Sequence, residues 1–189
     1  IVCFCLLVAL LVGSAVTPKF SFDNTVDIIG HRGAGGVAPE NTRVAIEQAI
    51  LAGAQWVEID VQETADGEVV VIHDSDLMKI AGVDLKVWDA SVEGITSVDI
   101  GTSFHPKFHD ERVPKLQEIL ELCKGKIGII IELKSYGHGQ MLEQRVVDLV
   151  EASGSVDEVQ CMSLKAGVVA HLKKIRPQWR VGLLLSLAV

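Results

Sequence analysis

Short apolar runs alternate with amphipathic stretches along the chain from Val26 onward. The apolar runs have the length of strands and are apolar on both faces, which is typical of strands buried in a parallel sheet. The pattern predicts strands over Val26–Gly30, Gln55–Asp60, Glu68–Ile72, Ile127–Leu133, Val159–Met162 and Val181–Leu185. The alternation of strands and helices indicates an α/β fold, and both a (β/α) barrel and an open doubly wound sheet fit it.

The amphipathic stretches between these runs predict helices. They are expected over 42–53, 114–125, Leu142–Ala152 and Ala166–Ile175. Asn41 or Thr42 is expected to cap the first helix, because short polar side chains satisfy the free N–H groups of a helix start. The segment Ser75–Phe108 is less regular and rich in Gly, Asp and Ser, so it is predicted to hold loops and an insertion.

The first sixteen residues, Ile1–Val16, contain no charged side chain. As a helix they would span roughly 24 Å, which is short of the ~30 Å hydrocarbon core of a bilayer. We predict that residues 1–18 are the end of a transmembrane helix or, alternatively, a signal-peptide-like segment. A membrane-anchored protein with an extracytoplasmic catalytic domain over 26–189 follows from this prediction. Because the chain begins with Ile and ends in an uncapped apolar run, we expect it to be cut at both ends.

Charge and cysteine content exclude some classes of function. The formal net charge is −8, whereas nucleic-acid-binding surfaces are normally basic, so we expect no nucleic-acid partner. The four cysteines form no CxxC pair and no Cys/His ligand spacing, so neither a structural zinc site nor a disulfide framework is predicted.

Ionisable residues gather at the ends of four predicted strands. The residues in question are His31 and Arg32, Glu58 and Asp60, His73 and Asp74, and Glu132 and Lys134. In barrels and in open α/β sheets, the carboxyl ends of the strands are the edge at which active sites are built. We therefore expect these side chains to meet at one site.

Glu58 and Asp60 are two residues apart on a predicted strand, so both carboxylates point to the same face. With Glu132 arriving from another strand, the three would repel one another unless a cation lay between them. Oxygen ligands alone favour a hard ion such as Mg²⁺ or Ca²⁺. Salt bridges to Arg32 or Lys134, or plain solvation, are the alternative explanation for the carboxylate pair.

His31 and His73 have side chains whose usual pKa, about 6.5, suits proton transfer at neutral pH. Cleavage of a phosphodiester needs one proton removed from the nucleophile and one delivered to the leaving oxygen. Arg32 and Lys134 have the positive charge that phosphate oxygens require. The combination predicts a metal-dependent phosphodiesterase.

Together these motifs resemble the glycerophosphodiester phosphodiesterase family in order and spacing, from about Val26 to the end of the chain. The matching segments are Gly30-His31-Arg32-Gly33, Pro39-Glu40-Asn41-Thr42, Glu58-Ile59-Asp60-Val61, Asp66-Gly67, His73-Asp74 and Glu132-Leu133-Lys134. The apolar segment before the first strand is similar to the bacterial branch in which membrane helices precede the catalytic domain.

The resemblance implies a TIM barrel, here with about six of its eight β/α units, that hydrolyses glycerophosphodiesters to glycerol 3-phosphate and an alcohol. It implies that His31 and His73 are the acid–base pair. Glu58, Asp60 and Glu132 would be the ligands of Ca²⁺ or Mg²⁺. Arg32 and Lys134 match the positions that contact phosphate.

One region departs from the family's pattern. Family members often have Arg and then Thr soon after the His-Asp pair, whereas Met78, Lys79 and Ile80 occupy that region here. Two other classes of function are alternatives to the leading one. They are a phospholipase D-like lipid-cleaving barrel, and a non-catalytic membrane-bound binding module on the same fold.

Overall fold

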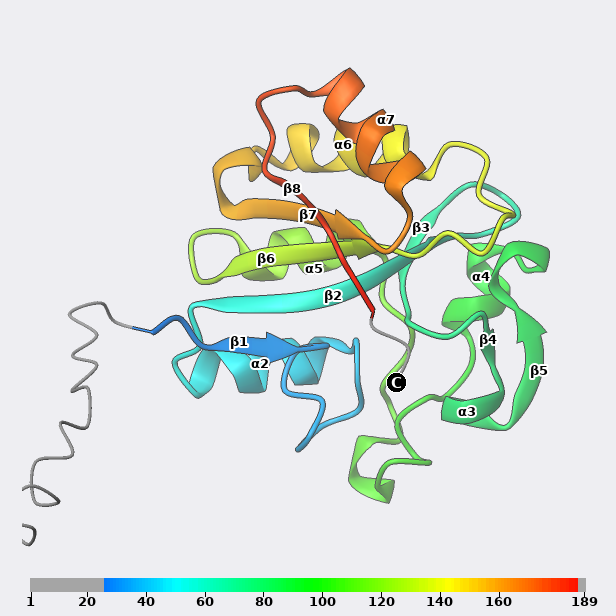
Figure 1. Ribbon diagram of the computed structural model, residues 1–189. Coiled ribbons are helices and arrows are strands. Elements are labelled where there is room, and N and C mark those ends of the chain that lie inside the picture. Colours follow the sequence, from blue (N-terminus) through cyan, green and yellow to red (C-terminus); the bar gives the residue numbers. More distant parts are fainter. Residues whose placement is uncertain (1–25, 187–189) are drawn as a thin grey trace, which may run out of the picture.

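The computed structural model describes residues 26–186 as a curved sheet covered by helices (Figure 1). Five strands run parallel, and they follow one another across the sheet in the order in which they occur along the chain. They are β1 (Ile29–His31), β2 (Trp56–Glu63), β6 (Gly128–Leu133), β7 (Val159–Ser163) and β8 (Val181–Leu183). This order has no reversal point, which an open doubly wound sheet requires.

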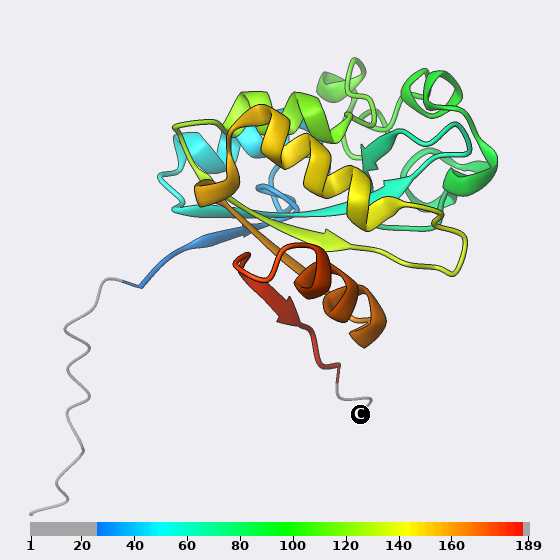
Figure 2. The ribbon, with the colours of Figure 1, turned by 90° about the horizontal axis from the view of Figure 1, so that it is seen from above.

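Four helices connect the parallel strands and cover the sheet. They are α2 (Arg43–Leu51), α5 (Leu116–Cys123), α6 (Leu142–Ser153) and α7 (Ala166–Ile175). Each contacts the next along the chain, and Figure 2 shows α2, α5 and α6 side by side on one face of the sheet. Sequential strands with all neighbouring helices on one face are the arrangement of a TIM-barrel-like fold. Of the two folds that fit the sequence, the (β/α) barrel therefore agrees with the structure and the open doubly wound sheet does not.

The alternation of side chains divides the sheet into an apolar face and a polar face. On β2, Val57, Ile59 and Val61 join the main hydrophobic core under the helices. Glu58 and Asp60 alternate with them and so point to the opposite face. The same alternation on β6 places Ile129, Ile131 and Leu133 in this core and Glu132 on the opposite face.

The strand predicted over Glu68–Ile72 is present as β3 (Val69–Val71), but it runs antiparallel to β2. It is the return arm of a hairpin rather than the strand of a β/α unit. The parallel sheet among residues 26–186 therefore has five strands. The sequence predicted about six β/α units, and this number was wrong because β3 was included among them. The hairpin also lengthens β2, which continues three residues beyond the predicted end at Asp60.

The first and last parallel strands form the two borders of the described sheet. Ile29 of β1 and Leu183 of β8 are exposed there, at 49% and 46% of their surface. Both borders of the described sheet thus present apolar side chains that no described element covers.

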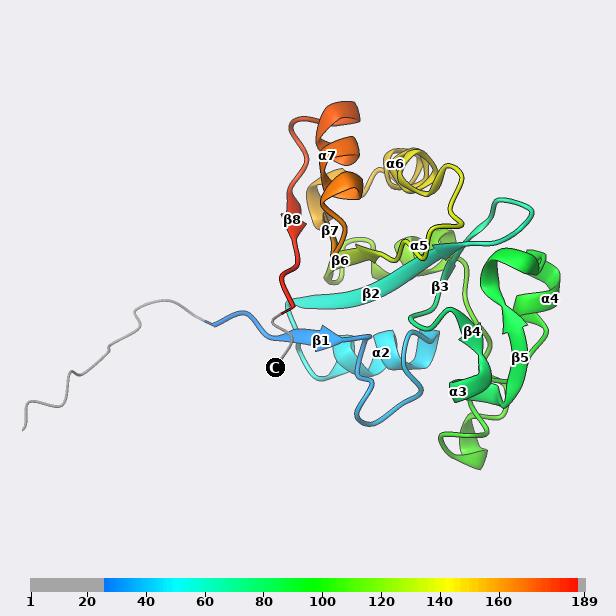
Figure 3. The same cartoon turned by 45° about the vertical axis from the view of Figure 1, so that its right-hand side comes forward.

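The predicted insertion over Ser75–Phe108 has short elements and a hydrophobic cluster of its own. The elements are β4 (Asp76–Leu77), α3 (Met78–Ala81), β5 (Val83–Lys86) and α4 (Val92–Thr96), with short 3₁₀ turns at Val87–Asp89 and Pro106–Phe108. Leu77, Val87 and Ile95 are fully buried in this second cluster. Figure 3 shows the insertion on one side of the sheet, next to β3. A third 3₁₀ turn, Val156–Glu158, precedes β7.

The predicted membrane segment, residues 1–18, lies outside the described residues. Between residues 26 and 186, no helix has the length and apolar character needed to cross a membrane.

Candidate active site

Three carboxylates from two neighbouring strands form the centre of the site. Asp60 of β2 and Glu132 of β6 are partners in the strand register, and Glu58 lies two residues before Asp60. One oxygen of each carboxylate lies within 4.8 Å of the other two. All three residues are buried, with Asp60 only 1% exposed. The sheet therefore forces together three groups that repel one another when ionised.

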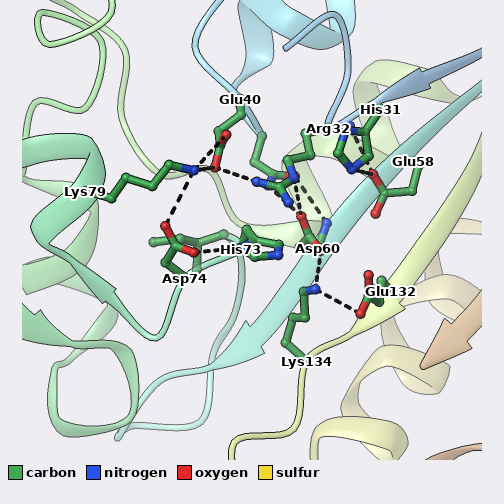
Figure 4. A network of polar contacts seen from close by, with 12 residues as sticks. His31, Arg32, Glu40, Glu58, Asp60, His73, Asp74, Lys79, Glu132 and Lys134 are labelled. Atoms are coloured by element: carbon green, nitrogen blue, oxygen red, sulfur yellow. Dashed lines mark hydrogen bonds and ion pairs between the residues drawn. The ribbon is translucent and has the colours of Figure 1, made fainter. Parts of the chain in front are cut away.

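Two cations partly neutralise the cluster (Figure 4). Lys134 Nζ lies 2.9 Å from Glu132 Oε1 and 3.2 Å from Asp60 Oδ1. Arg32 Nε lies 3.5 Å from Asp60 Oδ2, and the backbone N–H of Arg32 donates to Glu58 Oε2 at 3.0 Å. The salt bridges that the sequence offered as an alternative to a metal site are thus present together with the carboxylate cluster.

The charges nevertheless do not balance. Burial, followed by the charge of Asp60 and then that of Glu132, raises the pKa of Glu58 to about 7. For Lys134, burial alone would lower the pKa, but the hydrogen bond to Glu132 and the charge of Asp60 outweigh it and raise the pKa. An excess of negative charge therefore remains among the three carboxylates.

These residues fit a divalent cation. The donor set consists of oxygens only, and the groups converge from two paired strands. Hard ions such as Ca²⁺ and Mg²⁺ prefer such ligands. Within residues 26–186, this is the one group of three or more acidic, His or Cys side chains close enough to share a metal ion.

His31 is the last residue of β1 and lies level with Glu58 in the strand register. Its Nε2 atom is 3.8 Å from Glu58 Oε2, and 75% of its side chain is exposed. The ring therefore borders the carboxylate cluster on its open side, where it can contact both substrate and solvent.

His73 reaches the site by the return arm of the hairpin. Its Nδ1 atom lies 2.7 Å from Asp74 Oδ1. The amide nitrogen of buried Gln62 donates to the carbonyl oxygens of Ile72, His73 and Asp74 at 3.0, 3.1 and 2.7 Å. A backbone bend held by one buried amide thus places His73 beside the carboxylates, although β3 runs opposite to the strands that bear them.

Tyr136 gives the same bend a second support, because its hydroxyl donates to the carbonyl oxygen of His73 at 2.8 Å. A cavity of about 590 Å³ lies on this side of the site. Its lining includes His73, Glu132, Lys134 and Tyr136. The cavity gives a small substrate access to a histidine, a carboxylate and a lysine together.

Asn41 holds Asp60 with two hydrogen bonds. Its Nδ2 donates to Asp60 Oδ2 at 3.0 Å, and its Oδ1 accepts from the backbone N–H of Asp60 at 3.1 Å. Of the two caps that the sequence allowed for α2, Thr42 is the cap, since its hydroxyl accepts from Ala45 N. Asn41 and Arg32 are the two non-glycine residues with positive φ within residues 26–186, at 60° and 53°. Such conformations are uncommon outside glycine and concentrate at functional sites.

Gly33 lets the loop after β1 pass close to α2. Its φ is +75°, and a Cβ atom there would lie 2.7 Å from the carbonyl carbon of Ala45. Glycine alone adopts this positive φ without strain and has no Cβ to clash with α2. The last glycine of the Gly-His-Arg-Gly motif is therefore required by the backbone.

The region that departs from the family's pattern does contact the site. Lys79 Nζ lies 3.2 Å from Glu40 Oε1 and 3.7 Å from Asp74 Oδ2. Glu40 in turn accepts from Arg32 Nη1 at 3.0 Å. The structure thus brings together the seven residues expected to act at the site, with Asp74 beside them. It adds five residues to which the sequence patterns assigned no such contact: Glu40, Asn41, Gln62, Lys79 and Tyr136.

Comparison with known proteins places this arrangement in a family. Residues 31–187 match the sequence model of the glycerophosphoryl diester phosphodiesterase family. A glycerophosphodiester phosphodiesterase from Caldanaerobacter subterraneus is 35% identical over 162 residues, which cover 83% of this chain and 65% of that protein. A crystal structure of a glycerophosphodiester phosphodiesterase from Agrobacterium tumefaciens is 34% identical with a TM-score of 0.76, covering 83% of this chain and 66% of that one.

A phosphodiesterase from Oleispira antarctica, solved in complex with the product sn-glycerol-3-phosphate, has a TM-score of 0.79 at 27% identity. The match covers 84% of this chain and 65% of that one. The chain thus spans about two thirds of the length of each of these three relatives. Because the family match extends over residues 31–187 of the 189, the chain belongs to the glycerophosphoryl diester phosphodiesterase family.

Proposed function

We propose that this chain is the catalytic part of a hydrolase that cleaves glycerophosphodiesters to glycerol 3-phosphate and an alcohol with the help of a divalent metal ion. The observation that carries the proposal is the cluster of Glu58, Asp60 and Glu132, with two cations and two histidines around it. The name of the Caldanaerobacter relative and the product bound to the Oleispira enzyme support this substrate class. The family match favours it over a phospholipase D-like barrel and over a non-catalytic membrane module.

Arg32 and Lys134 bind the phosphate in this proposal. Both lie beside Asp60, so their charges are held at the site before substrate arrives. Preorganised charges of this kind stabilise the negative charge of a transition state without having to reorient. Lys134 lines the cavity that would admit the substrate.

His31 and His73 exchange protons with the substrate in this proposal. When the phosphodiester is cleaved, one new P–O bond forms to the attacking oxygen, which loses a proton. The P–O bond to the alcohol breaks, and the alcohol oxygen gains a proton. The two histidines lie on either side of Asp60 in the view of Figure 4, so one can serve the attacking oxygen and the other the leaving oxygen.

Glu58, Asp60 and Glu132 would hold the metal ion, which is Ca²⁺ or Mg²⁺ in our proposal. When bound, such an ion neutralises charge on the phosphate and lowers the barrier to attack. Asn41 keeps Asp60 in its orientation through the two hydrogen bonds described above.

The test is release of glycerol 3-phosphate from glycerophosphocholine by the full protein. We expect turnover with Ca²⁺ or Mg²⁺, none in EDTA, and a loss of about 10²- to 10⁴-fold in kcat for His31→Ala. His171→Ala is the matched control, since His171 is half exposed on α7 and contacts Glu143 rather than the site. Activity that survives both EDTA and His31→Ala would contradict the proposed mechanism.

We also propose that residues 1–18 attach the protein to a membrane, with the catalytic part on the extracytoplasmic side. This proposal rests on the uncharged run Ile1–Val16 alone. Release of the full protein from membranes by alkaline carbonate would argue against an integral anchor.

A further inference from the structure

Lys79 has no part in the chemistry described so far, yet its ammonium group lies between two carboxylates of the site. It belongs to α3 of the insertion, and its Nζ is 3.2 and 3.3 Å from the two oxygens of Glu40. On its other side it is 3.7 Å from Asp74 Oδ2. Glu40 lies in the loop that follows β1, and Asp74 lies in the bend that follows β3, so one side chain joins three separate segments.

Each of these two carboxylates holds one functional side chain. Glu40 accepts a hydrogen bond from Arg32 Nη1 at 3.0 Å, and Asp74 contacts His73 Nδ1 at 2.7 Å. Lys79 therefore stands at the branch point of two short chains of contacts (Figure 4). One chain runs through Glu40 to the proposed phosphate ligand, and the other runs through Asp74 to a proposed proton carrier.

Asp74 depends on Lys79 in particular. Its Oδ1 atom is used by His73, while its Oδ2 atom is buried and has no hydrogen-bond partner. Lys79 is the cation that faces this oxygen. Without it, Asp74 would have an uncompensated buried oxygen, and it would be free to turn away from His73.

The orientation of His73 follows from the contact with Asp74. An ionised carboxylate only accepts hydrogen bonds, so the proton of the neutral ring lies on Nδ1. The Nε2 atom is then the free base. Arg32 is restrained similarly, since its Nη1 atom is used by Glu40 while its Nε atom faces Asp60.

We propose that Lys79 is a positioning residue that sets the orientations of His73 and Arg32 together, through Asp74 and Glu40. The inference rests on the proposed function. It also gives the insertion a role, because α3 packs through Ile80 and Ala81 on the second hydrophobic cluster and thereby fixes where Lys79 lies.

The contribution of Lys79 to stability is expected to be small. Its side chain is 58% exposed, and ion pairs of exposed side chains stabilise proteins only weakly. A loss of activity in a Lys79 variant that still folds therefore reports a positioning role rather than unfolding.

The first experiment compares Lys79→Met with Lys79→Arg in the full protein. We expect Lys79→Met to lower kcat about 10- to 100-fold, because small misplacements of reacting groups are costly. Its midpoint of thermal unfolding should change by no more than about 3 °C. Lys79→Arg keeps the charge between the two carboxylates and should retain kcat within about threefold. Lys115→Met is the matched control, because Lys115 forms a similar exposed pair with Glu68 at 3.4 Å.

The second experiment tests the branch that runs through Asp74 to His73. Since Lys79 acts through its partners, the loss in the double variant Lys79→Met/Asp74→Asn should be smaller than the product of the single losses. The ring nitrogen shifts of His73, measured by ¹⁵N NMR without substrate, should show protonated Nδ1 in the wild type and a mixture of tautomers in Lys79→Met.

The outcomes distinguish this inference from the proposed function. A wild-type protein that cleaves no glycerophosphodiester would overturn the proposed function, whatever the NMR shows. An active wild type whose Lys79→Met variant keeps full kcat and an unchanged His73 tautomer would overturn the positioning role and leave the proposed function intact.

Discussion

The carboxylates and His73 reach the same site by different means. Glu58, Asp60 and Glu132 stand on two central parallel strands, and the backbone ladder between β2 and β6 fixes their spacing. His31 stands on the border strand β1, and His73 stands in a bend outside any strand. The proposed metal ligands are thus built into the sheet, and so is His31, which lies in register with Glu58, whereas the position of His73 depends on side-chain hydrogen bonds.

The two parts of the site should therefore respond differently to substitution. A strand ladder is a cooperative structure that a single substitution shifts little, so a change to a carboxylate alters the chemistry and leaves the geometry in place. The bend at His73 is held by Gln62, Tyr136 and Asp74, each through one side chain. A change to one of these should move the histidine and produce a graded loss.

The largest effect is expected for Asp60→Asn. The substitution removes a proposed metal ligand and a charge, so activity should fall by about 10³-fold, which corresponds to roughly 4 kcal/mol. The fold should persist with a change of at most about 2 kcal/mol in the free energy of unfolding, because Lys134 keeps Glu132 as a partner. Activity assays and urea denaturation measure the two effects.

Asp148→Asn is the matched control for that substitution, because Asp148 is exposed on α6 and accepts only from Gln144. Its activity should equal that of the wild type. If Asp60→Asn instead unfolded the protein, the carboxylates would be part of the fold's stability and the comparison of the two parts would fail.

A second, smaller effect concerns pH. The pKa of Glu58 is raised from 4.5 to about 7, so the folded metal-free protein holds a proton that the unfolded chain has already lost. This more tightly bound proton stabilises the folded protein by about 3 kcal/mol. The stabilisation is complete below about pH 4.5 and is lost as the pH rises to about 7. Urea denaturation in EDTA at pH 5 and pH 7.5 measures it. Glu58→Gln should abolish this pH dependence, whereas Glu47→Gln, on the exposed side of α2, should not.

Repeating these unfolding measurements with Ca²⁺ or Mg²⁺ tests whether Glu58 binds the metal ion. Since the ion competes with the proton for Glu58, its affinity should increase as pH rises towards 7 and then level off. The metal ion should therefore increase the free energy of unfolding most at the pH values at which the metal-free protein is least stable. Equal metal affinity at pH 5 and pH 7.5 would show that Glu58 is not a ligand.

The smallest effect is expected for Gln62→Leu. It removes the amide that bonds three carbonyl oxygens of the bend, so kcat should fall about tenfold and the free energy of unfolding by about 1–3 kcal/mol. Gln144→Ala, which removes a solvent-side amide of α6, is the control. A Gln62→Leu variant as impaired as Asp60→Asn would mean that the two parts of the site are equally rigid.

Hydrophobic periodicity was sufficient to locate most elements of the fold. The apolar runs and caps predicted the positions of most elements correctly. These are the strands β2, β6, β7 and β8 and the four helices that cover the sheet. Strand direction was not readable, because an apolar run has the same pattern in a parallel and in an antiparallel strand. For that reason β3 was counted as a β/α unit, although it returns along β2 in a hairpin.

The side chains that support the site were harder to recognise than those at its centre. Gln62, Tyr136 and Lys79 act on residues far away in the sequence, and no local spacing marks them. The sequence around Asn41 indicated only a possible helix cap. In the structure its side chain instead forms a hydrogen bond with Asp60. Such roles depend on which segments meet in space.

The α/β fold class and the placement of Glu58, Asp60 and Glu132 on the polar face of the sheet could be predicted from the sequence alone. Those properties depend on the alternation of side chains along a strand, which is local. Only the tertiary structure decided that the strands form a barrel-like sheet in sequential order, that the hairpin carries His73 back to Asp60, and that Lys79 lies between Glu40 and Asp74. These are long-range contacts, and they exist only once burial of the two hydrophobic clusters has brought distant segments together.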